Sequence, residues 1–276
     1  MDAGSGGAVA MNVMTTSESD ISARFSAAAT TYDRAVTVHD QVATDLLALF
    51  PEAETPDRIL EPGCGTGLLT RKLLARFPQA RIDAFDVSPE MIAQAAHLCP
   101  SGDSLNHRVA GFEEAAAAWG SYDVILSSAA LHWAPSLPDA VQALDRCFAS
   151  GGRFHCAFML DGTLSELHRA RRAVVSNKPV HAVLPTLAQG RSAFDAMGWT
   201  CEQVTERSYQ VTLPNARAVL RQIHDQGVTG GDVSHGPLPL TRGELVRLQN
   251  YYDTHFATDD GVSVTSVVGF FSYRKP

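Results

Sequence analysis

The stretch Ile59-Leu60-Glu61-Pro62-Gly63-Cys64-Gly65-Thr66-Gly67 decides the fold class of this chain. A short apolar run of strand character leads into three alternate glycines, and residues 68–77 then have the pattern of a helix. Glycine permits positive φ and lets a ligand approach the backbone closely. The N-terminus of the following helix offers free N–H groups to an anionic ligand. We therefore predict a strand–loop–helix unit that holds a ligand at the carboxyl end of a parallel strand.

Segments of strand and helix character alternate around this unit. Beyond the strand at 58–61 we predict strands at 81–86, 107–110, 122–127 and 153–160, with helices at 38–49, 88–98 and 137–148 among them. This alternation is typical of an α/β fold, here a Rossmann-like, mostly parallel seven-stranded sheet flanked by helices. Later helices are predicted at 163–175, where Thr163 and Glu166 have capping-box spacing, and around 216–223 and 245–252, before a last strand at 262–273. We expect residues 1–20 to be a disordered tail and residues 21–276 to be one domain, with N-terminal lid helices and a helical insertion around 161–256.

The spacing between the glycine loop and the next acidic strand end indicates the kind of ligand. The second strand ends in Asp86, which stands 19 residues after Gly67. A carboxylate there can accept hydrogen bonds from both ribose hydroxyls of a nucleoside. The loop does not match the dinucleotide pattern G-x-G-x-x-G, and no G-x-x-x-x-G-K-[ST] occurs in the chain, so a P-loop NTPase is disfavoured. The pattern indicates a nucleoside site.

The loop after the fourth strand, Ser127-Ser128-Ala129-Ala130-Leu131-His132-Trp133, is a second candidate for chemistry. Loops at this edge of a parallel sheet face the bound ligand. Trp133 can pack over the ligand and exclude water, or it can be a core residue. His132 can hydrogen-bond a substrate oxygen, or it can be an ordinary loop residue.

Composition excludes several classes of protein. The chain has 276 residues, of which 45% are hydrophobic and 19% charged, as in an ordinary globular protein. Its net charge of −8 disfavours general nucleic-acid binding. The five cysteines lie far apart without C-x-x-C spacing, which argues against a disulfide framework or a metal site and fits a cytoplasmic location. No apolar run is long enough for a membrane span.

The run E-P-G-C-G-T-G resembles the nucleoside loop of class I S-adenosylmethionine-dependent methyltransferases. The resemblance covers about residues 20–160 and implies S-adenosyl-L-methionine as cofactor, with S-adenosyl-L-homocysteine as product. Many relatives carry an acidic residue after the third strand that contacts adenine, and Gly111 stands in that place here, which leaves Glu113 and the backbone near Phe112 as candidates. Glu113 can equally be a solvated helix start. The cofactor-binding residues implied are Glu61, Gly63, Gly65 and Gly67 around the methionine part, Asp86 at the ribose, and Val87, Met91, Phe112, Glu113 and Ser128.

Three further stretches resemble the malonyl-acyl-carrier-protein O-methyltransferases of biotin synthesis, over about residues 20–274. They are F-S-A-A-A-T-T-Y-D at 25–33, G-T-L-S-E-L at 162–167 and L-T-R-G-E-L at 240–245. The resemblance implies methylation of the free carboxylate of a malonyl thioester, with Tyr32 on a lid helix that closes over cofactor and substrate. Together with the loop residues His132 and Trp133, Tyr32 is a candidate catalytic residue. Tyr32 can also be a helix aromatic packed on the core.

A basic segment suggests where an acidic carrier protein would dock. Arg169, Arg171, Arg172 and Lys178 place four positive charges in ten residues, and such a patch can steer an acidic partner. A solvated helix face explains the same pattern. Two other functions stay open: a methyltransferase for a small acceptor such as trans-aconitate or a quinone, and a non-methylating cofactor-binding protein such as an assembly factor or a hydroxylase.

Overall fold

A computed structural model describes residues 17–51, 53–114, 120–178, 184–228 and 239–276 of the chain. Of the expected disordered tail, residues 1–16 lie outside the described residues. The end of that stretch was expected to be disordered, but it is helical, because helix α1 spans Glu18–Ala28. The Ser17 side chain caps this helix by accepting a hydrogen bond from the Asp20 N–H. The N-terminal helix therefore begins before the boundary drawn from the sequence.

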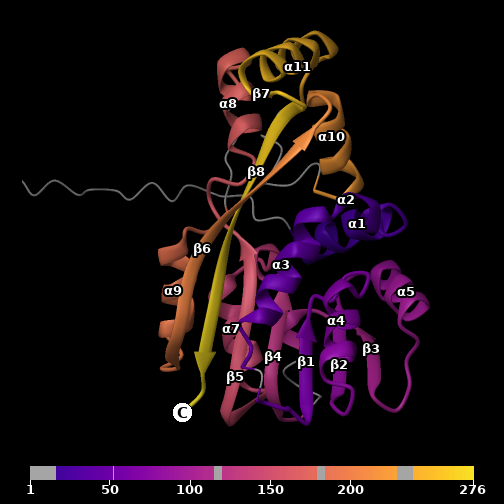
Figure 1. Cartoon of the computed structure of the whole chain (residues 1–276), viewed down its shortest axis with the longest axis vertical. Coiled ribbons are helices and arrows are strands. Elements are labelled where there is room, and N and C mark those ends of the chain that lie inside the picture. Colours follow the sequence, from indigo (N-terminus) through magenta and orange to yellow (C-terminus); the bar gives the residue numbers. More distant parts are fainter. Residues whose placement is uncertain (1–16, 52, 115–119, 179–183, 229–238) are drawn as a thin grey trace, which may run out of the picture.

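The centre of the molecule is a mixed sheet in the order β3-β2-β1-β4-β5-β8-β6, with the short β7 paired to β8 (Figure 1). The first five strands of this order are parallel, and β8 and β6 run antiparallel. The expected Rossmann-like α/β fold is confirmed. The strands are β1 (Arg58–Pro62), β2 (Arg81–Asp86), β3 (Leu105–Val109), β4 (Tyr122–Ser128), β5 (Phe148–Met159), β6 (Thr200–Leu213), β7 (Ala257–Thr258) and β8 (Gly261–Arg274).

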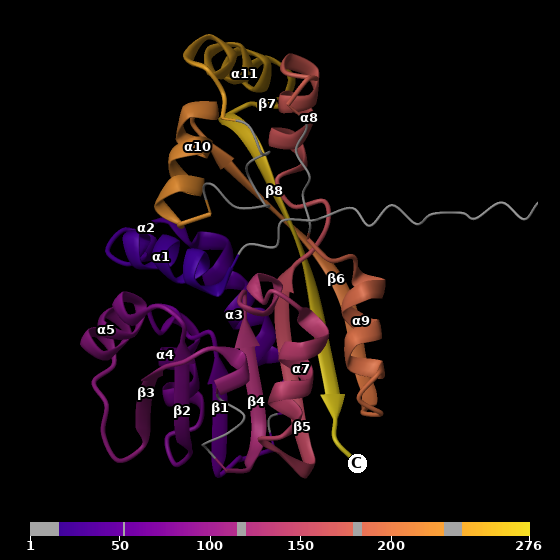
Figure 2. The same cartoon turned by 180° about the vertical axis from the view of Figure 1, so that it is seen from behind.

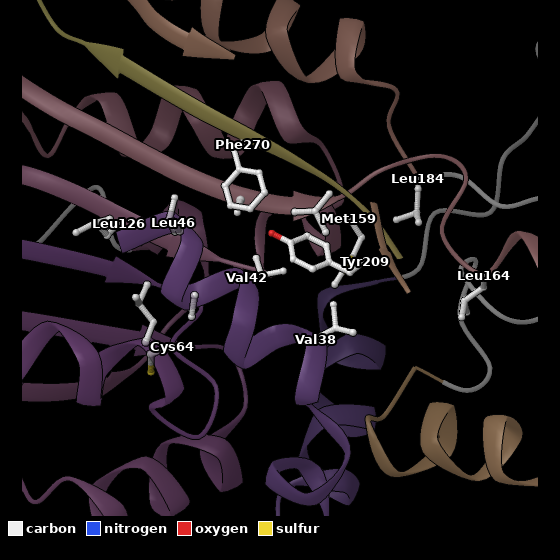
Figure 3. Close-up of a cluster of buried hydrophobic side chains, with 14 of the residues drawn as sticks. Val38, Val42, Leu46, Cys64, Leu126, Met159, Leu164, Leu184, Tyr209 and Phe270 are labelled. Atoms are coloured by element: carbon white, nitrogen blue, oxygen red, sulfur yellow. The ribbon is translucent and has the colours of Figure 1, made fainter. Parts of the chain in front are cut away.

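Helices cover both faces of the sheet, and strand residues alternate between the two cores they create (Figures 1 and 2). Ile59 packs in the core with α3 and α4, whereas its neighbour Leu60 packs in the core with α7 and α9. This is the period-two pattern of strands buried on both sides. Figure 3 shows the first core, where Val42 and Leu46 of α3 lie near Leu126 of β4. The helices are α1, α2 (Tyr32–Ala35), α3 (Thr37–Ala48), α4 (Leu68–Arg76), α5 (Pro89–Leu98), α7 (Leu137–Asp145), α8 (Ser165–Val174), α9 (Leu187–Asp195), α10 (Ala216–Asp225) and α11 (Arg242–His255), with a 3-10 turn, η1 (Leu131–Trp133).

Strands β6 and β8 form a long antiparallel pair that extends beyond the rest of the sheet. Their pairing runs from Thr200 opposite Arg274 to Leu213 opposite Val262, whereas β5 pairs only with Val268 to Arg274. The other half of β8 therefore continues past β5 and carries α8, α10 and α11, which we call the lobe helices (Figure 1). The sequence analysis did not predict this pairing, because it did not identify β6 as a strand. Tyr209 is the one fully buried residue of β6, so the strand lacks an apolar signal.

Two smaller expectations were wrong. Strand β5 begins at Phe148 and not at residue 153, so residues 148–152, with Gly151 and Gly152, lie inside the strand. Helix α8 forms, but without the expected capping box, since its N-cap is Leu164. The Thr163 hydroxyl donates instead to the Val267 carbonyl, and the Glu166 carboxylate accepts from the Thr265 N–H. Both side chains therefore attach the lobe to β8. Within the described residues, no helix is long and apolar enough to cross a membrane.

Candidate functional site

The glycine loop joins β1 to α4 and leaves room for a ligand. Gly63, Gly65 and Gly67 all have positive φ, at +67°, +54° and +83°. A side chain on Gly63 would overlap the Cβ of Ala130, whereas a Cβ on Gly65 would meet no atom within 4 Å. Gly63 is thus required by the packing of two loops against each other. Gly65 faces open space, which is the cavity described below.

Asp86, at the end of β2, ties this loop to the next one. Its carboxylate accepts hydrogen bonds from the Gly65 N–H and from the Ser88 N–H, each at 2.9 Å. Burial raises the pKa of Asp86, and these backbone donors partly offset that effect. The carboxylate therefore holds the two loops in register at the rim of the cavity.

Glu61 places a buried carboxyl beside the glycine loop. The side chain is 1% exposed and accepts a hydrogen bond of 2.6 Å from the Thr70 hydroxyl. Burial raises the pKa of Glu61 to about 8. The residue makes no ion pair among the described residues, so a cationic ligand group would stabilise its ionised form.

A cavity of about 900 Å³, its open mouth included, lies over these loops. Gly67 and Glu113 do not line it: Gly67 is the N-cap of α4, where an added Cβ would touch Ala95 and Cys99 of α5, and Glu113 is exposed. His132 lines a second, adjoining cavity instead. The other site residues expected from the sequence line the first cavity: Tyr32, Glu61, Gly63, Gly65, Asp86, Val87, Met91, Phe112, Ser128 and Trp133.

Helix α1 closes the cavity from the side opposite the sheet. It contributes Glu18, Ile21 and Phe25 to the lining, none of which the sequence reasoning selected. Two serines spaced one helical turn apart hold it: the Ser22 hydroxyl donates to the Val87 carbonyl at 3.0 Å, and Ser26 bonds the Ser88 hydroxyl at 2.9 Å. This serine spacing was the available signal.

The loop after β4 brings Trp133 to the boundary between the two cavities. The chain turns at Ala129, where φ is +55°, one of two described residues other than glycine with positive φ. Backbone strain of this kind is found mainly at functional sites. Trp133 lines both cavities and also packs against the first core, so its core packing is confirmed and its role over a ligand stays a prediction.

Four aromatic side chains separate the two cavities. Phe25, Tyr32, His39 and Trp133 line both. The Phe25 ring meets Trp133 edge-on at a centroid distance of 5.2 Å, and Tyr32 meets His39 at 5.9 Å. A ligand in one cavity therefore lies one side-chain layer from a ligand in the other.

The second cavity offers neutral hydrogen-bonding groups. The residues that line it include no Lys, Arg, Asp or Glu among the described part of the chain. Burial lowers the pKa of His132 to about 3 and that of His39 to about 4, so both imidazoles are neutral at pH 7. The Nδ1 atom of each is buried without a hydrogen-bond partner in the described structure. Such atoms are rare in folded proteins, and a ligand in this cavity could hydrogen-bond to them.

The basic segment divides into two pairs. Arg171 is 3% exposed and its Nε donates to the Lys178 carbonyl, while the Lys178 ammonium pairs with Glu244 of α11 at 2.7 Å. These two residues join lobe helices to each other, and the expectation of a four-residue docking patch is wrong for them. Arg169 and Arg172 are exposed on α8.

Comparisons with known proteins agree with this geometry. Residues 60–154 match the family described as a methyltransferase domain. A malonyl-[acyl-carrier protein] O-methyltransferase of Hahella chejuensis is 35% identical over 94% of this chain and 91% of its own length. Another, of Pseudescherichia vulneris, is 33% identical over 83% and 87%.

Solved structures show the same fold at low identity. The YcgJ protein of Bacillus subtilis is 14% identical with a TM-score of 0.58, covering 84% of this chain and 98% of that one. The geranyl diphosphate C-methyltransferase of Streptomyces coelicolor, solved in complex with S-adenosyl-L-homocysteine, is also 14% identical, with a TM-score of 0.50 over 85% and 78%.

Proposed function

The chain belongs to the malonyl-[acyl-carrier protein] O-methyltransferase family, and from this premise we propose that it methylates the free carboxylate of a malonyl thioester on acyl carrier protein, a step toward biotin, using S-adenosyl-L-methionine. The observation that carries the proposal is the pair of cavities with a shared aromatic wall. A methyl transferase needs a cofactor and an acceptor at near-attack distance with water excluded. Because Phe25, Tyr32 and Trp133 line both cavities, the two ligands would lie side by side, and transfer requires that these side chains leave the reacting atoms in direct contact.

The first cavity suits the cofactor. Asp86 lies at the sheet edge where it accepts from the loop backbone at 2.9 Å and keeps lone pairs for ribose hydroxyls. Gly65 leaves open space for close approach of the ligand to the backbone. Glu61 is a buried acid two residues before Gly63, and it suits the positively charged methionine part. The cofactor, when bound, supplies a methyl group on a cationic sulfur.

The second cavity suits a malonyl group. A carboxylate is already a nucleophile at neutral pH, so no general base is needed. The O–CH₃ bond forms as the S–CH₃ bond breaks, the bonding pair stays on sulfur, and no proton moves. One negative and one positive charge disappear, which a water-poor cavity favours because the separated charges are poorly solvated there. Neutral donors such as His132 and Tyr32 can orient the carboxylate and still accommodate the neutral ester.

We place the carrier protein against the outer face of α8. Arg169 and Arg172 are the exposed basic residues of the predicted segment, and α8 is one of the lobe helices, of which α10 lines the second cavity. An acidic carrier protein would be attracted to these charges, although the chain as a whole has a net charge of −8.

An acceptor screen tests the function. The protein is incubated with labelled S-adenosyl-L-methionine and malonyl-acyl carrier protein, malonyl-CoA, trans-aconitate or a quinol, and the methylated product and S-adenosyl-L-homocysteine are measured. We expect the highest kcat/KM on malonyl-acyl carrier protein. Faster turnover of a small acceptor would assign the site to a small-molecule methyltransferase. Failure to form S-adenosyl-L-homocysteine with every acceptor would favour a non-methylating protein.

A further inference from the structure

The first cavity contains an acidic group that arrives from outside the sheet. Gly111, just after β3, has no side chain, and a Cβ built on it would overlap the carboxylate of Glu18 and lie 2.9 Å from its Cδ. The backbone of Gly111 has no positive φ, so its conformation does not by itself require glycine. The space beside β3 that a side chain at position 111 would fill is therefore occupied by a carboxylate of helix α1.

The order of the strands indicates which part of the cofactor lies there. The glycine loop follows β1, the proposed ribose acceptor Asp86 ends β2, and β3 is the next strand outward. A nucleoside that continues in this direction from the ribose places its base at the end of β3. The walls at that point are the apolar side chains of Val87, Met91 and Phe112, which suit the faces of a planar ring. The polar edge of the base then faces the rim, where Glu18 lies.

Glu18 is an exposed residue at the rim of the first cavity, and its carboxylate can accept a hydrogen bond from a ligand there. Among the described residues, no side chain donates to its carboxylate or forms an ion pair with it. Its pKa is raised by burial and then by repulsion from Glu114 and Glu113. An amino group with two N–H donors, such as the exocyclic amine of adenine, could donate a hydrogen bond to this carboxylate.

We propose that Glu18 recognises the adenine base by accepting a hydrogen bond from its exocyclic amino group, so that helix α1 and not the sheet supplies base specificity. This inference rests on the proposed cofactor. Because Ser22 and Ser26 attach the same helix to Val87 and Ser88, the base, the ribose loop and the lid form one connected unit. Recognition of the base and closure of α1 over the cavity are then the same event.

The first test uses two ligands that differ only at the base. S-adenosyl-L-homocysteine carries a 6-amino group, and S-inosyl-L-homocysteine carries a 6-oxygen that cannot donate to a carboxylate. Calorimetry on the whole chain should show that the wild type binds the adenosyl ligand about tenfold or more tightly. Glu18→Gln should reduce or reverse this preference, because its amide can donate to the 6-oxygen. The matched control is Glu90→Gln, which changes an exposed glutamate of α5 and should keep the wild-type preference.

The second test moves the carboxylate from the helix to the sheet. Gly111→Asp alone should weaken binding of S-adenosyl-L-homocysteine, since the new side chain competes with Glu18 for the same space. The Glu18→Ala variant should bind S-adenosyl-L-homocysteine about tenfold more weakly than the wild type. Adding Gly111→Asp to this variant should restore binding. Gly111→Asp should thus lower the affinity of the wild type but raise the affinity of the Glu18→Ala variant. A merely structural role of Glu18 would not produce this reversal. Thermal unfolding without ligand confirms that each variant is folded.

The outcomes separate this inference from the proposed function. If the wild type binds S-adenosyl-L-homocysteine and both Glu18 variants keep its affinity and its preference for the adenosyl ligand, the role of Glu18 is refuted while the cofactor assignment stands. Additive effects of the two substitutions would refute it as well. Absence of any binding to the wild type would refute both proposals.

Discussion

The two cavities differ in what builds them. The first is founded on backbone loops, with side chains completing its lining: the loops after β1, β2 and β4 meet at one edge of the sheet, and the Asp86 carboxylate bonds two of them. The second is made by side chains from α2, α3, the loop after β4 and the lobe, which lie far apart in the sequence. A backbone-built site depends on a few residues that cannot be exchanged. A side-chain-built site tolerates more change, so substitutions in the two cavities should differ in size.

The largest effect should follow Gly65→Val. A β-branched residue at φ +54° is strained, and its side chain would project into the first cavity. We expect no measurable binding of S-adenosyl-L-methionine by calorimetry in a protein that still unfolds cooperatively. Gly63→Ala should instead lower the melting temperature, because its Cβ overlaps Ala130. Near-native cofactor affinity of Gly65→Val would contradict a backbone-built site.

Asp86→Ala should come next. It removes a carboxylate that accepts two backbone hydrogen bonds and, by our proposal, the ribose hydroxyls. Losing hydrogen bonds to a charged group costs about 1.5–3 kcal/mol, or about one to two decades in cofactor Kd. The KM for the acyl acceptor at saturating cofactor should not change. Unchanged cofactor Kd in the folded variant would refute the ribose assignment.

The pH dependence of cofactor binding should reflect the ionisation of the Glu61 carboxyl group. Because its pKa is raised to about 8 without ligand, the group is protonated at pH 7 and must lose that proton beside a cation. Affinity for S-adenosyl-L-methionine should therefore fall by up to tenfold per pH unit as the pH drops below about 8. Calorimetry in buffers of different ionisation enthalpy should also detect proton release. The conservative variant Glu61→Gln should flatten the slope, and an equally steep slope in that variant would exclude Glu61 as its source.

His132→Phe should affect only the second cavity. The substitution keeps an aromatic ring and removes the ring nitrogens, one of which is buried without a partner. We expect kcat/KM for malonyl-acyl carrier protein to fall about tenfold while the cofactor Kd stays constant. Since the pKa of His132 is about 3, its protonation should leave no inflection in the activity profile between pH 6 and pH 8. The exposed His97 of α5, changed to Phe, is the control. A parallel loss of cofactor affinity would show that the cavities are not separable at this residue.

The smallest effect should come from the lobe surface. Reversing Arg169 and Arg172 to Glu should raise KM for malonyl-acyl carrier protein severalfold at low salt. The effect should fade at physiological salt, where charges are screened within about 8 Å. The matched control reverses Arg81 and Arg146, which are exposed at the start of β2 and just before β5. If both double variants raise KM for malonyl-acyl carrier protein equally, the effect comes from the net charge of the protein and not from docking on α8.

Most of the sheet could be predicted, and the reasons are local. Strand Tyr122–Ser128 is buried on both faces and carries the apolar run Val124-Ile125-Leu126, and Ser88 with Pro89 gives an unmistakable helix start. Strand β6 could not be predicted from periodicity, because it lies at the edge of the sheet with one fully buried residue. Thr163 and Glu166 had the spacing of a cap, yet both bond to β8, since partners distant in sequence competed successfully for the same groups.

The sequence by itself determined the cofactor edge of this protein. A tight strand-to-helix turn requires glycine wherever φ is positive, and a parallel sheet brings the ends of β1 and β2 together whatever else the chain does. Only the tertiary structure decided that Glu18 fills the place beside Gly111, that His132 belongs to the second cavity, and that Lys178 pairs with Glu244. These contacts join elements that pack against each other without a local signal, because side-chain contact across distant segments depends on how helices dock and not on residue spacing.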